Sequence, residues 1–157
     1  MSETARLRVY RFEDGAYEGR IIGALEQIEL IGDIRLLDAL LVARDSATGE
    51  LQAIDRATGR ADGTMATLLD FRLNPASRRE TTERTLAAHP EGVPASAIED
   101  LAARLEPGGA VVAVLVAGGT PAELEDAVAR GRGRVLADER VAAGTLAEVV
   151  PRLRSAV

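Results

Sequence analysis

Apolar and polar residues alternate in the first patterned stretch of the chain and predict a β-strand from Leu7 to Phe12. Leu7 and Val9 fall on one face of this strand, and Tyr10 and Phe12 on the other. Apolar residues then recur every three or four positions through 17–28, which predicts a helix with one apolar face.

The helix over 17–28 is expected to begin after Asp14, a residue type that caps helix N-termini, and to end at Gly32. The run 34–43 that follows is apolar on both faces, as in a strand covered on both sides. One face is expected to hold Ile34, Leu36, Leu40 and Val42, and the other Leu37, Ala39 and Leu41. A turn over 45–49 leads to a third strand, 51–55, predicted to pair as a hairpin.

Regular patterning is lost over 56–93, which is predicted to be an irregular, mobile insertion. A short helix could form over 65–71. Residues 78–89 have a helix-forming composition with Leu86 as their strong apolar anchor, so they are expected to be exposed, partly ordered or packed on a partner. No domain boundary is recognised, and residues 1–157 are predicted to form a single domain.

The last third of the chain alternates between helix and strand signals. Capping boxes at 96–99, 120–123 and 145–148 each predict the start of a helix. Strands are predicted between them over 110–117 and 134–141. Pro151 falls inside the last helical pattern, so a kink or an early stop is expected there.

Strand, helix and strand follow one another twice, over 7–42 and again over 110–141. The predicted fold class is therefore α+β: two βαβ units in a ferredoxin-like or elaborated ferredoxin-like sandwich, with helices mainly on one side of a mixed sheet. The uncovered face would then meet another copy of the chain, giving a homo-oligomer, or be covered by the C-terminal helix folding back.

Composition narrows the classes of function. The 157 residues are 46% hydrophobic and carry a net charge of −6, which argues against nucleic acid as a partner. Cysteine is absent and every basic residue is arginine, which excludes thiolate metal sites, a Schiff-base lysine and a P-loop lysine. No secretory signal or membrane span is recognised, so a cytoplasmic location is expected.

Asp38 interrupts the most apolar predicted strand. A carboxylate there is expected to be hydrogen-bonded, to pair with Arg8, Arg11 or Arg35, or to lie at a strand end near water, because an unpaired buried charge is costly. A structural ion pair is the favoured interpretation. The alternative is a functional acid with a raised pKa, although the sequence places no nucleophile or histidine beside it.

A second candidate site is the sequence Gly118-Gly119-Thr120, which joins a strand to a capped helix. Backbone N–H groups at such a junction can bind an anion, with Arg130 and Arg132 as additional ligands. The stretch lacks the phosphate-binding motifs GxGxxG and GxxxxGK[ST], and a tight strand-to-helix turn is the favoured explanation. His89 is the sole histidine, and neither a metal site nor a cofactor is predicted.

Three stretches carry a resemblance to a known family: Tyr17-x-Gly19-x-Ile21-x-x-Ala24-Leu25 with Ile31-Gly32-x-Ile34-Arg35-x-Leu37-Asp38-x-x-x-Val42-x-x-Asp45, then Leu101-x-x-x-Leu105-Glu106-Pro107-Gly108, then Gly133-x-Val135-x-Ala137-x-Glu139-Arg140-Val141. In these the chain resembles an uncharacterised, mostly actinobacterial family of small proteins of unknown function. Some relatives are labelled membrane proteins, a label not carried over to a chain without a spanning segment. The resemblance implies that Asp38 belongs to the family's pattern, and it implies no activity.

Together these observations predict a non-catalytic, cytoplasmic module that self-associates or binds another protein. The alternative is a sensor of a small anionic ligand, a metabolite or nucleotide, at Gly118-Gly119-Thr120. An enzyme that uses Asp38 with Arg35 or Arg11 is a third hypothesis.

Overall fold

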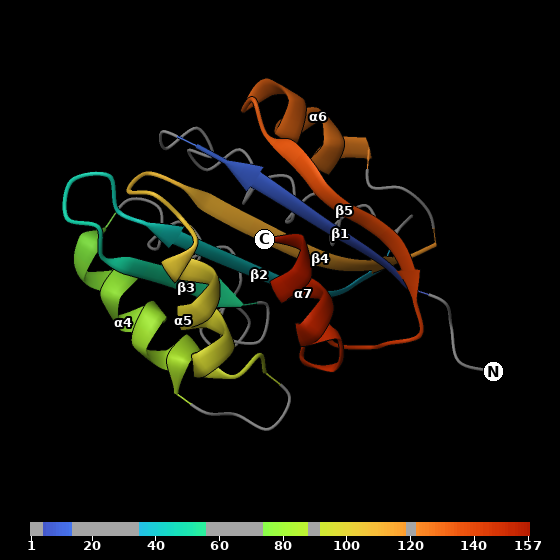
Figure 1. Ribbon diagram of the computed structural model, residues 1–157, viewed down its shortest axis with the longest axis horizontal. Coiled ribbons are helices and arrows are strands. Elements are labelled where there is room, and N and C mark those ends of the chain that lie inside the picture. Colours follow the sequence, from blue (N-terminus) through green and yellow to red (C-terminus); the bar gives the residue numbers. More distant parts are fainter. Residues whose placement is uncertain (1–4, 14–34, 56–73, 88–91, 119–121) are drawn as a thin grey trace.

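The structure is a computed structural model that describes residues 5–13, 35–55, 74–87, 92–118 and 122–157 (Figure 1). The predicted helix over 17–28 with its cap Asp14, the short helix over 65–71, His89, and the Gly119 and Thr120 of the candidate anion site lie outside these residues. In chain order the elements are β1 (Ala5–Phe12), β2 (Arg35–Arg44), β3 (Leu51–Asp55), α4 (Pro75–Leu86), α5 (Ala95–Ala103), β4 (Ala110–Ala117), α6 (Ala122–Arg130), β5 (Arg134–Val141), the 3₁₀ helix η1 (Leu146–Val149) and α7 (Val150–Ala156).

The five strands form one sheet in the order β3-β2-β4-β1-β5, and every neighbouring pair is antiparallel. The fold is therefore α+β, as predicted, although the sheet is antiparallel throughout rather than mixed. All five predicted strands are present, and β2 and β3 form the predicted hairpin. Its turn uses Gly49 at a φ of +72°, a conformation that glycine adopts without steric cost.

Both faces of the sheet carry apolar clusters, because β1, β2 and β4 alternate two sets of apolar side chains. The α5 face holds Leu7, Leu40 and Leu115 under α5, η1 and α7. The opposite α6 face holds Phe12 and Val114, together with side chains of α6. Among the described elements, α5, η1 and α7 pack on one face of the sheet and α6 packs on the other. Strand β4, at the centre of the sheet, is buried along its whole length.

A β-bulge in β2 changes the face on which its first residues lie. The register with β4 shifts between Leu36 and Asp38, so that Leu37 and Asp38 both stand at Leu115. Leu36 consequently packs on the α6 face with Ala39, while Leu37 packs on the α5 face. The prediction that Leu36 shares a face with Leu40 and Val42 was wrong, because strict alternation ignores the extra residue of the bulge.

Segment 56–93 contains a regular helix in its described part. Helix α4 begins after Asn74, whose side-chain oxygen accepts hydrogen bonds from Ala76 N and Ser77 N, as in an N-cap. It packs along β3, and its Leu86 contacts the apolar cluster of the α5 face. The apolar anchor recognised in the sequence is therefore used within the chain.

The C-terminal helix folds back over the sheet, as the sequence analysis allowed. Leu146 of η1 and Leu153 of α7 are fully buried in the cluster of the α5 face. The break predicted at Pro151 occurs where η1 ends and α7 begins, with the proline in the first turn of α7.

The capping box at 96–99 was a wrong prediction. Helix α5 begins at Ala95 after Pro94, which makes no side-chain capping hydrogen bond, so Ser96 already lies inside the first turn. Pro94 holds an extended conformation, with φ −59° and ψ 145°, and takes the N-cap position two residues before Ser96.

Candidate functional site

Asp38 ties β2 to the C-terminal segment of the chain. Its Oδ2 accepts a hydrogen bond from Leu146 N at 2.8 Å, and its Oδ1 accepts one from Ala39 N at 2.9 Å. The first contact caps the start of η1 from a residue 108 positions earlier. The bulge explains the geometry, because the extra residue re-aims the side chain at this point.

These contacts give Asp38 a structural role between strand and 3₁₀ helix. Its predicted ion pair with Arg35 stays a prediction. Arg11 has other contacts, since its Nη2 donates to Arg104 O at 3.4 Å and its Nε lies 3.8 Å from Glu13 Oε1. Arg11 thereby links β1 to the end of α5.

Of the residues in the candidate anion site, the structure describes Gly118, Arg130 and Arg132. Gly118 follows β4 with a φ of +95° and precedes α6. Arg130 is the last residue of α6, and Arg132 follows it. At a rise of about 1.5 Å per residue, the length of α6 separates the two ends by roughly 12 Å. Arg130 lies 4.0 Å from Asp126 on the same helix.

Arg8, a buried arginine in β1, forms a polar cluster with side chains of α6 and β5. Arg8 is 6% exposed, and its Nε donates to the Tyr10 hydroxyl at 2.6 Å. Its guanidinium pairs with Asp138 of β5 at 3.0 Å and with Glu125 of α6. One cation therefore holds β1 to α6 and β5, which lie more than a hundred residues further along the chain.

The protonation states of Arg8 and Tyr10 give this cluster a structural rather than a catalytic role. Burial raises the pKa of Tyr10, although the hydrogen bond from Arg8 opposes that rise. Burial alone would lower the pKa of Arg8, but its interactions with Tyr10 and the carboxylates raise it overall. At neutral pH the phenol stays protonated and the guanidinium stays charged, so neither group can act as a general base. Sequence alternation places Arg8 and Tyr10 on one face, but it cannot place Glu125 and Asp138 beside them.

The two edges of the sheet differ in how they are covered. At the β3 edge, the outward N–H of Ala53 donates to Thr82 Oγ1 of α4 at 3.0 Å, and that hydroxyl donates to Arg78 O at 2.7 Å. Thr81 and Thr85 are buried beside it. A helix lying on an edge strand protects it from pairing with another chain.

The β5 edge has no such cover in the described part of the chain. No described strand pairs with its outer side, and β5 is the most exposed of the five strands. Val135, at 51% exposed, is the large apolar residue that lies most open to solvent among the described residues. The register with β1 shifts at this position, so that Leu136 has no partner in β1.

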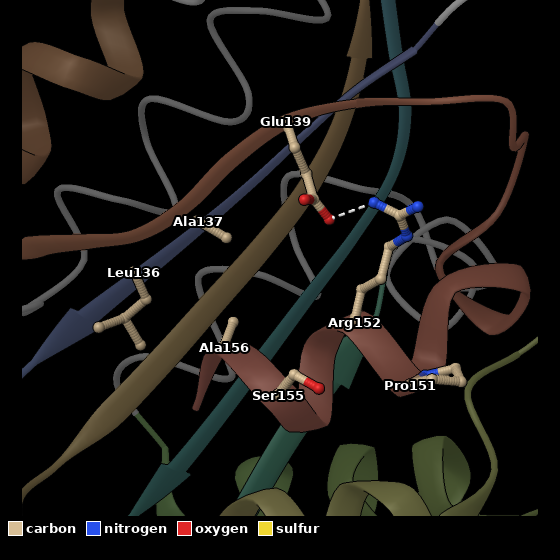
Figure 2. A pocket seen from close by; sticks show the side chains of 7 residues that line it. All are labelled: Leu136, Ala137, Glu139, Pro151, Arg152, Ser155 and Ala156. Atoms are coloured by element: carbon tan, nitrogen blue, oxygen red, sulfur yellow. Dashed lines mark hydrogen bonds and ion pairs between the residues drawn. The ribbon is translucent and has the colours of Figure 1, made fainter.

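A groove of about 350 Å³ runs between β5 and α7 on the α5 face of the sheet. Figure 2 shows its two walls and the ion pair that crosses it, in which Arg152 Nη1 donates to Glu139 Oε1 at 2.8 Å. The bulge lets two consecutive residues of β5 line this groove. The lining residues are Leu136, Ala137, Glu139, Pro151, Arg152, Ser155 and Ala156.

Sequence reasoning missed this edge. The sequence predicts a strand over 134–141, but whether a strand lies at an edge depends on the order of the strands in the sheet. The presence of four charged residues among the eight of 134–141 was the available signal, since charged residues are frequent in edge strands.

Within the described ranges, no cluster of histidine, aspartate and glutamate side chains has the arrangement of a metal site. None of the helices found in those ranges has the length and apolar character needed to cross a membrane.

Comparison of the chain with protein-family models, with curated proteins and with solved structures found no match. The resemblance to an actinobacterial family therefore stays a prediction. The geometry of the sheet edge and its groove is the basis on which a function can be argued.

Proposed function

We propose that the protein is a non-catalytic, cytoplasmic module that binds an extended segment of another protein along β5. In this mode the bound segment adds a strand to the sheet, with backbone hydrogen bonds supplying affinity and side-chain pockets supplying specificity. The observation that carries the proposal is the difference between the two sheet edges: α4 covers β3, whereas β5 borders a groove.

The groove supports this mode because of where it lies. A segment pairing with β5 would direct every second side chain towards α7, over Leu136, Ala137 and Ala156. About 350 Å³ is near the lower end of the range for small-molecule pockets, roughly 300–1,000 Å³. That size suits a few side chains of a bound segment.

Self-association through an open sheet face has less support. Both faces carry packed helices, and central residues such as Val112 and Leu115 are fully buried within one chain. A second copy of the chain is the other candidate for the β5 edge, and the sedimentation experiment below distinguishes it from another protein. The anionic-ligand alternative is less favoured, because Arg130 lies 4.0 Å from Asp126 on its own helix.

The order β5-β1-β4-β2 also supports a finer fold proposal. If β3 is left out and the remaining strands are renumbered, their order is 4-1-3-2 with all neighbours antiparallel, as in a ferredoxin-like sheet. In this proposal β3, α4 and α5 form an insertion between the second and third strands of that sheet.

Selection from a random peptide library, followed by amide chemical-shift mapping, tests the binding function. Selected peptides are expected to shift the amides of β5 and α7. Ser155→Trp should abolish binding, because Ser155 is exposed and lines the groove, where an indole would fill the space. Ser96→Trp is the matched control: Ser96 is also an exposed helical serine, and it lies on α5, outside the groove.

The proposal fails if no peptide is selected, or if the selected peptides shift amides away from β5 and α7. Sedimentation of the free protein identifies the occupant. A dimer that Ser155→Trp dissociates and Ser96→Trp preserves would show that a second copy takes this edge, which would overturn the assignment to another protein.

A further inference from the structure

We infer that the segment bound along β5 is acidic, with carboxylates near both of its ends and small or apolar side chains between them. This inference rests on the proposed function, because it concerns the same edge of the sheet. It follows from the charges beside β5, where the carboxylates are already paired within the chain and two arginines are free.

The carboxylates of β5 are already paired within the chain. Asp138 accepts a hydrogen bond from Arg6 Nε at 2.6 Å and another from Arg8 Nη1 at 3.0 Å. Glu139 accepts one from Arg152 Nη1 at 2.8 Å. Neither carboxylate therefore presents an unpaired negative charge to an incoming segment.

The free charges at the two ends of β5 are arginines. Arg132 lies just before the strand and Arg140 lies one residue before its end, and both are exposed. Arg132 holds a φ of +58° in the turn between α6 and β5. Neither side chain makes an ion pair or hydrogen bond in the part of the chain that the structure describes. The open edge is thus positive at both ends on a protein whose net charge is −6.

The spacing of these arginines sets the length of the segment. From the first residue of β5, Arg134, to Arg140 is six positions, so at about 3.3 Å per residue an extended partner that reaches Arg140 and passes the start of β5 towards Arg132 would span at least roughly 20 Å. Side chains of directly opposed residues in neighbouring strands have Cβ atoms about 4.5–5.5 Å apart, within reach of an arginine–carboxylate pair.

The middle of β5 favours apolar side chains in the partner. On the α5 face, Leu136 and Ala137 open into the groove. Val135 pairs with Tyr10 in the register and so belongs to the α6 face, where it is 51% exposed. A segment with small or apolar central residues would cover both sides of the strand.

A second copy of this chain fits the free charges less well. The β5 strand of a second copy would bring its own Arg132 and Arg140, which are like charges. Like charges directly opposite each other across two strands are destabilising. The charged side chains and the bulge of β5 also hinder pairing of this edge with unrelated strands. A partner is therefore expected to be selected by charge that complements the two free arginines.

Three fluorescent peptides of about ten residues test the inference. They share one central alternation of valine and serine and carry glutamate, serine or arginine at both ends. Fluorescence anisotropy at low salt is expected to show the tightest binding for the glutamate peptide, and added salt should weaken this binding. Equal affinity for all three peptides, or a preference for the arginine peptide, would overturn the inference.

The double variant Arg132→Asn, Arg140→Gln should weaken binding of the glutamate peptide roughly 2- to 30-fold, as expected for two exposed ion pairs. Asparagine tolerates the positive φ at position 132. Arg78→Gln, Arg79→Gln removes the same charge from α4 at the opposite edge and should change the affinity less than about 2-fold. Equal losses in the two variants would overturn the inference.

The two proposals fail in different ways. Library peptides that map to β5 but are neutral or basic would refute the acidic partner and leave strand addition standing. If the glutamate peptide binds but shifts amides only outside β5 and α7, strand addition at this edge is refuted.

Discussion

Asp38 connects two segments that the chain places more than a hundred residues apart. Its carboxylate caps η1 by accepting a hydrogen bond from Leu146 N. Such a hydrogen bond is strong because the acceptor is charged, and it satisfies an N–H group that has no partner within the helix. The position of α7, and hence one wall of the groove, depends on this contact.

Asp38→Asn is expected to lower the free energy of unfolding by about 1–2 kcal/mol, since a neutral amide replaces the charged acceptor of two N–H groups. Urea-induced unfolding measures the change. The control is Asp126→Asn, whose side chain is 77% exposed and 4.0 Å from Arg130. Its effect should stay within about 0.5 kcal/mol. Equal effects of the two substitutions would contradict the structural role of Asp38.

Tyr10 should determine how stability changes in alkaline solution. The chain has no lysine or cysteine, so its two tyrosines are the side chains that titrate near pH 10. Burial raises the pKa of Tyr10 above its ordinary value of 10.0, so the folded state holds this proton more tightly than the unfolded state. The resulting stabilisation is complete below about pH 10 and is lost as the pH rises through the folded-state pKa.

Urea unfolding of the wild type and of Tyr10→Phe from about pH 8 to pH 11 measures this effect. The variant should be less stable at pH 8, because Arg8 loses the hydroxyl that accepts from its Nε. Its stability should also fall less steeply above pH 10. The second tyrosine is present in both proteins, so parallel alkaline slopes would show that Tyr10 has no raised pKa.

Helix α6 meets β5 through a glycine that the core requires. A Cβ added at Gly133 would lie 2.5 Å from Phe12 Cε1 and 2.9 Å from Val128 Cγ1, closer than side-chain atoms can approach. The absent side chain allows α6 to pack on the end of β1, and Gly133 N donates to Val128 O to close the helix.

Gly133→Ala should therefore destabilise the protein by about 1–3 kcal/mol through overpacking. Gly144→Ala serves as the control, because the nearest atom to its added Cβ is Glu148 Oε1 at 3.9 Å. That substitution should be neutral or stabilise by up to about 1 kcal/mol. Thermal unfolding of both variants is the measurement, and a Gly133→Ala protein as stable as Gly144→Ala would show that the packing adjusts freely.

The elements themselves were largely predictable, because β1, β2 and β4 bury two alternating sets of side chains and the apolar face of a helix repeats every three or four residues. Strand β4, with eight buried residues, is the clearest example. The bulges at Leu37 and Leu136 were not predictable, since a bulge is defined by the partner strand. The cap of η1 escaped prediction for the same reason: the acceptor belongs to β2.

Across the molecule, the order of the strands decides which edge is open, and local pattern does not contain that order. The charge pattern of β5 would be the same whether it lay at an edge or beside another strand, so the pattern alone does not reveal the edge. The candidate residues Gly118 and Arg130 are close in sequence but have the whole of α6 between them along the chain, whereas Arg8 and Asp138 are 130 positions apart and form an ion pair. Function therefore has to be argued from the assembled sheet.

The same strand order has a consequence for synthesis of the chain. Strand β1 pairs with β4 and β5, both of which lie about a hundred residues further along the chain. At roughly 5–20 residues per second, a ribosome needs about 5–20 s to reach β4 after it has made β1. During that interval the apolar residues of β1 have neither of their final neighbours. Completion of the sheet must therefore await the last third of the chain, and a nascent protein stalled before β4 would be a substrate for chaperones.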